Sequence, residues 1–106
     1  MQDFMSLNEL RKELFKNSDF KKEYEENKPY YEIAKLIIGV RLKAGLTQKA
    51  LAEKIGTTQS RISAWENGKT KGMKIETLNK ILDATNNKLI LGAKNKDNDD
   101  DFAIAV

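Results

Sequence analysis

The sequence predicts an all-α fold: five packed helices over residues 30–93, preceded by one or two amphipathic helices and followed by a stretch that can form a short β-strand. Apolar residues recur every three or four positions through most of the chain, as on one face of a helix. Ser, Thr, Asn or Asp stand before several of these segments, where they can cap a helix. Gly45 and Gly56 follow two of them, where a helix can end. The length of 106 residues suits one domain with a modest core.

Two helices are expected before the five-helix domain. Residues 6–16 open with a capping box, in which Ser6 and Glu9 can satisfy backbone groups at the helix start. Residues 17–19 can cap a second helix, which should end before Pro29 because the residue before a proline is biased out of the helical conformation. The apolar face of this pair comprises Leu7, Leu10, Leu14, Phe15, Phe20 and Tyr24.

The helix over residues 30–43 should be the central buried one, because residues 36–40 are apolar on nearly every side. The last helix, over about residues 74–85, is expected to direct one apolar face into the core. That face comprises Ile75, Leu78, Ile81 and Leu82.

The C-terminal part departs from the helical pattern. Residues 88–93 are too short for another helix and apolar enough for a strand, which would need a dimer mate or another protein to pair with, or stay unpaired. Residues 94–106 combine an acidic run with a small apolar end, so we expect them to be mostly disordered. The acidic run could suggest a cation site, but it has no surrounding scaffold.

Residues 48–67 read as two short helices joined by a tight turn at Gly56. A glycine there can adopt the left-handed conformation that reverses the chain, and Thr57 or Thr58 can then cap the second helix. Polar side chains occupy the first turn of that helix, opposite its apolar face: Gln59, Ser60 and Arg61. This is the layout of a helix-turn-helix, whose second helix enters the DNA major groove.

Three side chains on this exposed face could contact bases. Gln59 could bond N6 and N7 of an adenine, and Arg61 could bond O6 and N7 of a guanine. Ala64, one turn further on, could contact only a thymine methyl group. The alternative for each polar residue is a solvated surface position.

Positive charge is concentrated in the same part of the chain. Residues 30–93 carry eleven Lys or Arg against five Asp or Glu, whereas residues 1–29 carry six against seven and residues 94–106 carry two against four. A basic patch provides sequence-independent DNA affinity through counterion release, although helical surfaces also carry lysine for solubility.

The composition argues against several other functions. Cys and His are absent, which removes disulfides, the usual zinc ligands and histidine-based catalysis, so we expect neither an enzyme nor a bound metal or cofactor. The first twenty residues are too charged for a signal peptide, and the apolar run at residues 36–40 is too short to span a membrane. We expect a cytoplasmic, nucleoid-associated protein without membrane contact.

Residues 41–71, RLKAGLTQKALAEKIGTTQSRISAWENGKTK, resemble the DNA-binding domain of lambdoid phage repressors and Cro proteins, the XRE-type regulators. The resemblance implies a repressor-like fold and a palindromic double-stranded operator. It also implies base contacts from Gln59, Ser60, Arg61 and Ala64, and phosphate contacts from Gln48, Thr58, Asn67, Lys69 and Lys71. Ser60 and Ala64 are shorter than the side chains of close relatives, so the operator sequence cannot be transferred from them.

The same resemblance implies an ion pair. Arg41 and Glu66 stand where phage repressors have an arginine and a glutamate that pair across the domain. Such a pair could orient the recognition helix, and the alternative is two unrelated surface charges that contribute little.

Residues 18–56, SDFKKEYEENKPYYEIAKLIIGVRLKAGLTQKALAEKIG, are similar to HigA-type antitoxins, in which an acidic-aromatic helix precedes the DNA-binding domain. This resemblance extends to about residue 92. It implies a RelE/HigB-like ribonuclease toxin that docks on the apolar face listed above, and repression of the toxin–antitoxin operon by a homodimer. Two alternatives remain: that face packs on the chain's own domain, or the chain is a stand-alone prophage or XRE-family regulator.

The sequence therefore predicts three segments. Residues 1–29 form a toxin-docking extension, residues 30–93 the DNA-binding domain, and residues 94–106 an acidic tail. A homodimer is expected because one recognition helix reads only a few base pairs. The last helix together with residues 88–93 is the suggested dimer surface.

Overall fold

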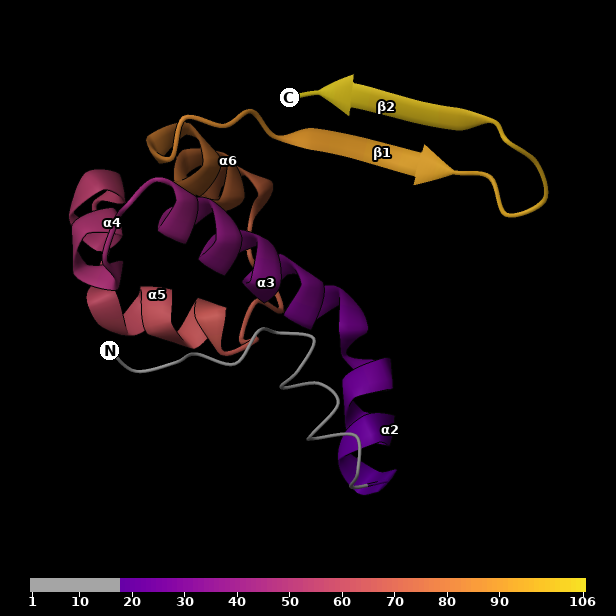
Figure 1. Ribbon diagram of the computed structural model, residues 1–106, viewed down its shortest axis with the longest axis horizontal. Coiled ribbons are helices and arrows are strands. Elements are labelled where there is room, and N and C mark those ends of the chain that lie inside the picture. Colours follow the sequence, from indigo (N-terminus) through magenta and orange to yellow (C-terminus); the bar gives the residue numbers. More distant parts are fainter. Residues whose placement is uncertain (1–17) are drawn as a thin grey trace.

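The computed structural model describes residues 18–106, within which it contains five helices and a two-stranded sheet (Figure 1). The expected helical fold with a short C-terminal strand is confirmed, although four helices rather than five lie within the domain and the fifth, α2, precedes it. The helix expected over residues 6–16 lies outside the described residues. The elements are α2 (Ser18–Glu26), α3 (Lys28–Lys43), α4 (Gln48–Ile55), α5 (Gln59–Glu66), α6 (Ile75–Ala84), β1 (Ile90–Lys94) and β2 (Asp101–Ala105).

Helix α3 begins earlier than expected. Lys28 is already helical, and Pro29 occupies the first turn, where its missing N–H removes no intrahelical hydrogen bond. The Asn27 carbonyl accepts hydrogen bonds from the backbone N–H groups of Tyr30 and Tyr31, at 3.0 and 3.2 Å. The steric bias before proline is therefore overcome, and a single residue separates α2 from α3.

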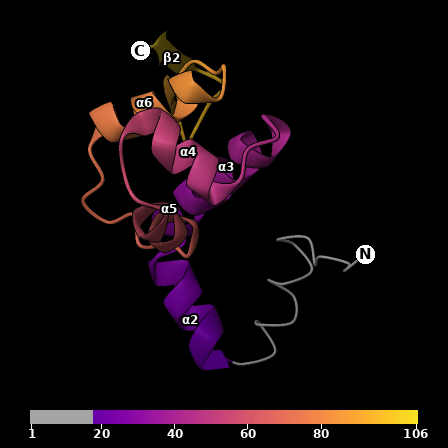
Figure 2. The same ribbon diagram turned by 90° about the vertical axis from the view of Figure 1, so that its left-hand side faces the viewer.

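The core lies where α3, α4, α5 and α6 meet. Each helix contributes one fully buried side chain, and these are Ile37, Leu51, Ile62 and Ile81. Ala52 is 3% exposed beside them, and its small side chain suits the close crossing of α4 and α5. Figures 1 and 2 show these two short helices packed at one end of the longer α3.

Two apolar expectations are wrong. Helix α3 buries only Ala34 and Ile37, while Leu36 is 43% exposed and Leu42 is 61% exposed. The reason is that the contacts of α3 with α5 and α6 cover only part of its surface and leave the rest open to solvent. Ile75, expected in the core, is 56% exposed because it is the first residue of α6, before that helix reaches the core.

The turn between α4 and α5 has the expected chemistry. Thr47 caps α4, its hydroxyl accepting a hydrogen bond from the Ala50 N–H at 3.0 Å. Gly56 follows the helix with φ 75°, a left-handed conformation in which a side chain would be strained. Thr58 then caps α5 by accepting from the Arg61 N–H at 3.2 Å.

The C-terminal strand finds its partner within the same chain. Strand β1 pairs antiparallel with β2, from Ile90 opposite Ala105 to Lys94 opposite Asp101. The expectation of a disordered tail is therefore wrong for β2, and the partner of β1 is neither a dimer mate nor another protein. Leu89, just before β1, is 3% exposed and anchors the hairpin to the helices.

No helix among the described residues is long and apolar enough to cross a membrane.

Candidate nucleic-acid interface

Helix α5 presents the predicted base-reading side chains to solvent. Gln59, Ser60 and Arg61 are exposed on its first turn, whereas Ile62 is fully buried. The side chains of Gln59, Ser60 and Arg61 make no hydrogen bond or ion pair with any residue of the described part of the chain, 18–106. The packing of Ile62 therefore fixes the helix while the polar side chains of its first turn stay available to a ligand.

The capping threonines permit a matched prediction. Thr58→Ala should cost about 1 kcal/mol of stability, and Thr47→Ala should cost a similar amount, because each removes one side-chain cap of a helix start. Only Thr58 precedes the turn that carries Gln59 and Arg61, so Thr58→Ala should weaken operator binding more. Urea denaturation and fluorescence anisotropy with a labelled operator would measure the two effects. Equal losses of operator affinity would contradict this role for the cap.

A basic groove of about 370 Å³ runs beside α5. It is lined by Arg61, Ala64, Trp65, Lys69, Lys71, Gly72, Met73, Lys74 and Thr77. The structure thus brings two predicted base-contacting residues together with two predicted phosphate-contacting lysines. Four cationic side chains and no carboxylate line the groove, which makes it suited to a polyanionic backbone.

Sequence reasoning missed two residues of this groove, Lys74 and Thr77. Lys74 is exposed, directly precedes α6, and lines the same groove as Lys71. The sequence shows that residues 68–74 are basic. Which of these lysines lie on the same surface depends on how the loop folds. Trp65 is half-buried, packing on the core from one side and lining the groove from the other.

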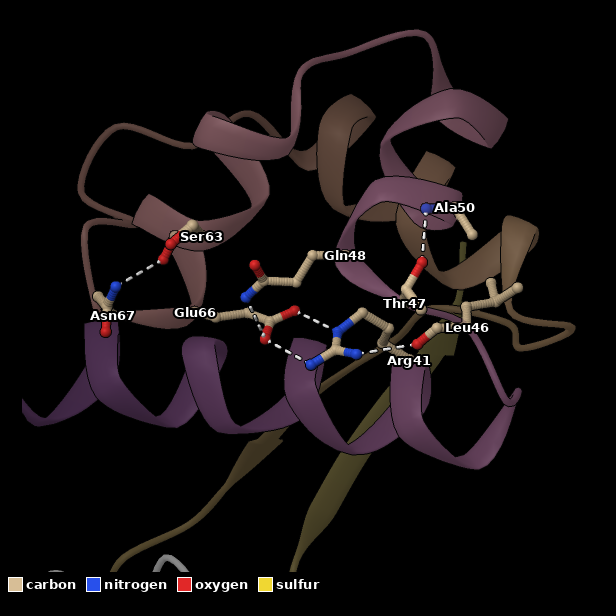
Figure 3. A network of polar contacts seen from close by, with 8 residues as sticks. All are labelled: Arg41, Leu46, Thr47, Gln48, Ala50, Ser63, Glu66 and Asn67. Carbon is tan, nitrogen blue, oxygen red and sulfur yellow. Dashed lines mark hydrogen bonds and ion pairs between the residues drawn. The ribbon is translucent and has the colours of Figure 1, made fainter.

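The other predicted phosphate-contacting residues, Gln48, Thr58 and Asn67, lie outside the lining of this groove. Gln48 is the first residue of α4, and its side-chain amide donates to Glu66 Oε1 at 3.2 Å. Asn67 follows the last residue of α5, and its Nδ2 donates to the Ser63 carbonyl at 2.9 Å (Figure 3). Their contacts with phosphate stay predictions.

Arg41 of α3 and Glu66 of α5 point toward one another between the two helices (Figure 3). Arg41 Nε donates to Glu66 Oε2 at 2.6 Å and Nη2 donates to Oε1 at 2.9 Å, a bidentate pair whose side chains are 12% and 7% exposed. Arg41 Nη1 also donates to the Leu46 carbonyl at 2.8 Å. The pair connects the end of α3, the loop before α4 and the end of α5, so it fixes the orientation of the recognition helix.

Comparison with known proteins agrees with this geometry. Residues 37–90, from α3 to the start of β1, match the model of the helix-turn-helix family. The chain belongs to this family. A search of curated proteins finds no match. The match covers α4, α5 and the basic groove, and it supports an XRE-type, DNA-binding transcriptional regulator.

The N-terminal part of this helix-turn-helix protein contacts the DNA-binding region through aromatic rings. Tyr24 of α2 stacks on Tyr31 of α3, with ring centroids 5.1 Å apart and planes 3° apart. Tyr31 in turn lies against Gly68, at the loop that carries Lys69. The Thr70 hydroxyl, in the same loop, donates to the Tyr30 carbonyl at 2.9 Å. Helix α2 is therefore connected to the basic loop by packing.

The predicted toxin-docking residues fall into two groups. Leu7, Leu10, Leu14, Phe15 and the side chain of Phe20 lie outside the described part of the chain. Tyr24 is half-buried against Tyr31, which is the intramolecular packing that the sequence left open as an alternative. Its role in docking stays a prediction.

Within residues 18–106 no cluster of carboxylates has the arrangement of a metal site.

Proposed function

We propose that this helix-turn-helix protein is an antitoxin that binds a palindromic operator as a homodimer, represses its own operon and neutralises a RelE-like ribonuclease toxin. The DNA-binding part is carried by one observation: a recognition helix with uncommitted polar side chains borders a groove with four cations and no carboxylate. Side chains on the helix supply base contacts, and lysines beside it supply phosphate contacts.

Helix α2 supports the toxin-binding part. It extends away from the helices that form the core (Figures 1 and 2), and Glu23, Glu25 and Glu26 are exposed along it. Four carboxylates against two lysines give this helix a net negative charge, which suits a basic partner such as a small ribonuclease. A domain that only reads DNA does not require residues 1–29, so their amphipathic pattern favours a protein partner.

A stand-alone XRE-family regulator is the second candidate. It is favoured by the stacking of Tyr24 on Tyr31, because an aromatic residue expected on the docking surface packs on the protein itself. In that case the role of α2 would be to support the loop at Gly68.

Co-purification from the native operon distinguishes the two candidates. A tagged chain should retain a small basic protein encoded by the adjacent gene, and that protein should be lost from a Leu10→Asp, Leu14→Asp double variant. Leu42→Asp is the matched control, because Leu42 is 61% exposed on α3, outside the proposed docking segment. Operator binding without any co-purifying protein would contradict the antitoxin proposal and support the stand-alone regulator.

A further inference from the structure

The hairpin of β1 and β2 carries large apolar side chains that nothing in the described chain covers. Every residue of both strands is exposed, including Phe102 at 70% and Ile104 at 64%. A two-stranded hairpin is marginally stable by itself in water, and a contiguous exposed apolar surface on a folded protein marks an interaction site. Figures 1 and 2 show the hairpin projecting from the helices.

The strand register places the apolar side chains on a defined face. Leu91 is opposite Ile104, and Ala93 is opposite Phe102, so these four side chains share one face, called here the hairpin apolar face. Leu89 lies two residues before Leu91, so its side chain points to the same face, and it is 3% exposed. The hairpin apolar face is therefore continuous with the buried core at the base of the hairpin. The opposite face of the hairpin carries Ile90, Gly92 and Lys94 of β1 and, across from them, Ala105, Ala103 and Asp101 of β2.

A shallow apolar groove lies on the open side of α3. Its volume is about 430 Å³, and Leu36, Gly39 and Val40 form its apolar part, with Glu32, Lys35, Lys43 and Asn87 around them. No atom lies within 4 Å of where a Cβ would stand on Gly39. The groove can therefore accept a side chain from another molecule at the middle of α3.

The charges indicate which molecule fits. The outer end of the hairpin, residues 94–101, carries four aspartates against two lysines, while Lys35 and Lys43 border the α3 groove against one carboxylate, Glu32, so the two surfaces have net charges of opposite sign. A second copy of the hairpin would thus supply both an apolar face for Leu36 and Val40 and carboxylates for the lysines. A surface that contains both complementary halves is self-complementary, as a two-fold interface requires.

We infer that a second copy of this chain docks here, each hairpin apolar face packing against the α3 groove of the other copy. This inference names the surface through which the proposed homodimer forms, and it rests on the proposed function for the two-fold arrangement on DNA. Figures 1 and 2 place the hairpin and α5 on opposite sides of α3, so this contact leaves both recognition helices uncovered. A two-fold dimer can then present one α5 to each half-site.

Sedimentation velocity of the full-length chain tests the inference with a matched pair of variants. Ile104 and Ile90 are 64% and 66% exposed on opposite faces of the hairpin, so Ile104→Asp and Ile90→Asp introduce the same charge at equal exposure. The wild type and Ile90→Asp should sediment as dimers, while Ile104→Asp should raise the dimer dissociation constant about 30-fold or more. Circular dichroism should show the same helical content for all three proteins.

Gly39→Arg tests the other half of the interface independently of hairpin folding. A Cβ at the exposed Gly39 meets no atom within 4 Å from outside the helix backbone, and a helix accommodates arginine better than glycine, so the variant should fold and sediment as a monomer. A monomeric wild type, a dimeric Ile104→Asp or Gly39→Arg, or equal dissociation by Ile90→Asp and Ile104→Asp would overturn the inference.

Half-site DNA binding separates this inference from the proposed function. The monomeric variants should still bind a single operator half-site with the affinity of one wild-type subunit. A wild type that binds the operator as a dimer, with Ile104→Asp and Gly39→Arg remaining dimeric as well, would refute only the dimer surface. A wild type that dimerises through this surface but binds no operator would refute only the proposed function.

Discussion

Glu66→Ala should reduce the stability of the domain by about 3–5 kcal/mol, the cost of removing one partner from a buried ion pair. The Arg41 side chain is 12% exposed, and without the carboxylate the remaining protein acceptor of its guanidinium would be the Leu46 carbonyl. Small domains have a total stability of about 5–15 kcal/mol, so a large part would be lost. Urea denaturation monitored by circular dichroism would measure the change.

Glu76→Ala is the control for this substitution. Glu76 pairs with Lys80 at 4.0 Å on the surface of α6, where the two side chains are 77% and 61% exposed, so its loss should cost less than about 0.5 kcal/mol. The double variant Arg41→Met, Glu66→Leu should recover most of the stability, because the uncompensated charge is removed with its partner. A Glu66→Ala cost no greater than that of Glu76→Ala would contradict the structural role of the pair.

Gly68→Ala should destabilise the protein by about 2–4 kcal/mol, through backbone strain and overpacking together. Gly68 has φ +94°, which an L-residue adopts only with strain, and a Cβ there would lie 2.5 Å from Cε1 and 2.6 Å from Cδ1 of Tyr31. The ring cannot move without disturbing its stack on Tyr24. Because the strain arises next to Lys69, DNA affinity should fall as well, and thermal unfolding with anisotropy titrations would measure both effects.

Gly72→Ala separates the two contributions to that cost. Gly72 has φ +80° in the same loop, but no atom lies within 4 Å of a Cβ placed there, so only the backbone strain of about 1–2 kcal/mol should remain. Tyr31→Ala combined with Gly68→Ala should cost less than the sum of the two single changes, because the clash is then absent. Equal destabilisation by Gly68→Ala and Gly72→Ala would show that the contact with Tyr31 contributes nothing.

The helices and the turn between α4 and α5 could be predicted because their signals are local. Thr47 and Thr58 are caps by residue type and position, and Gly56 has the left-handed conformation that a reversal between helices requires. The residues of α5 fall on its exposed and buried faces as the helical period predicts, with Arg61 exposed and Ile62 buried.

The remaining features depend on contacts between distant segments. The pairing of β1 with β2 joins two short strands across an acidic loop, and an acidic composition alone favours disorder over a hairpin. The open side of α3 could not be read from residues 36–40, since burial depends on which helices pack there. Lys74 joins Arg61 and Lys71 in one groove only because the loop folds back beside α5.

The central claim is that α5 reads DNA sequence while the adjacent lysines hold the DNA backbone. Fluorescence anisotropy with operator and random duplexes, over a range of salt concentrations, tests it through Arg61→Ala and Lys69→Ala. Arg61→Ala should cost about 1–3 kcal/mol on the operator and little on random DNA, whereas Lys69→Ala should weaken binding to both duplexes equally and reduce the salt slope by about 1. Equal losses on the operator and on random DNA from Arg61→Ala would contradict base reading by this helix.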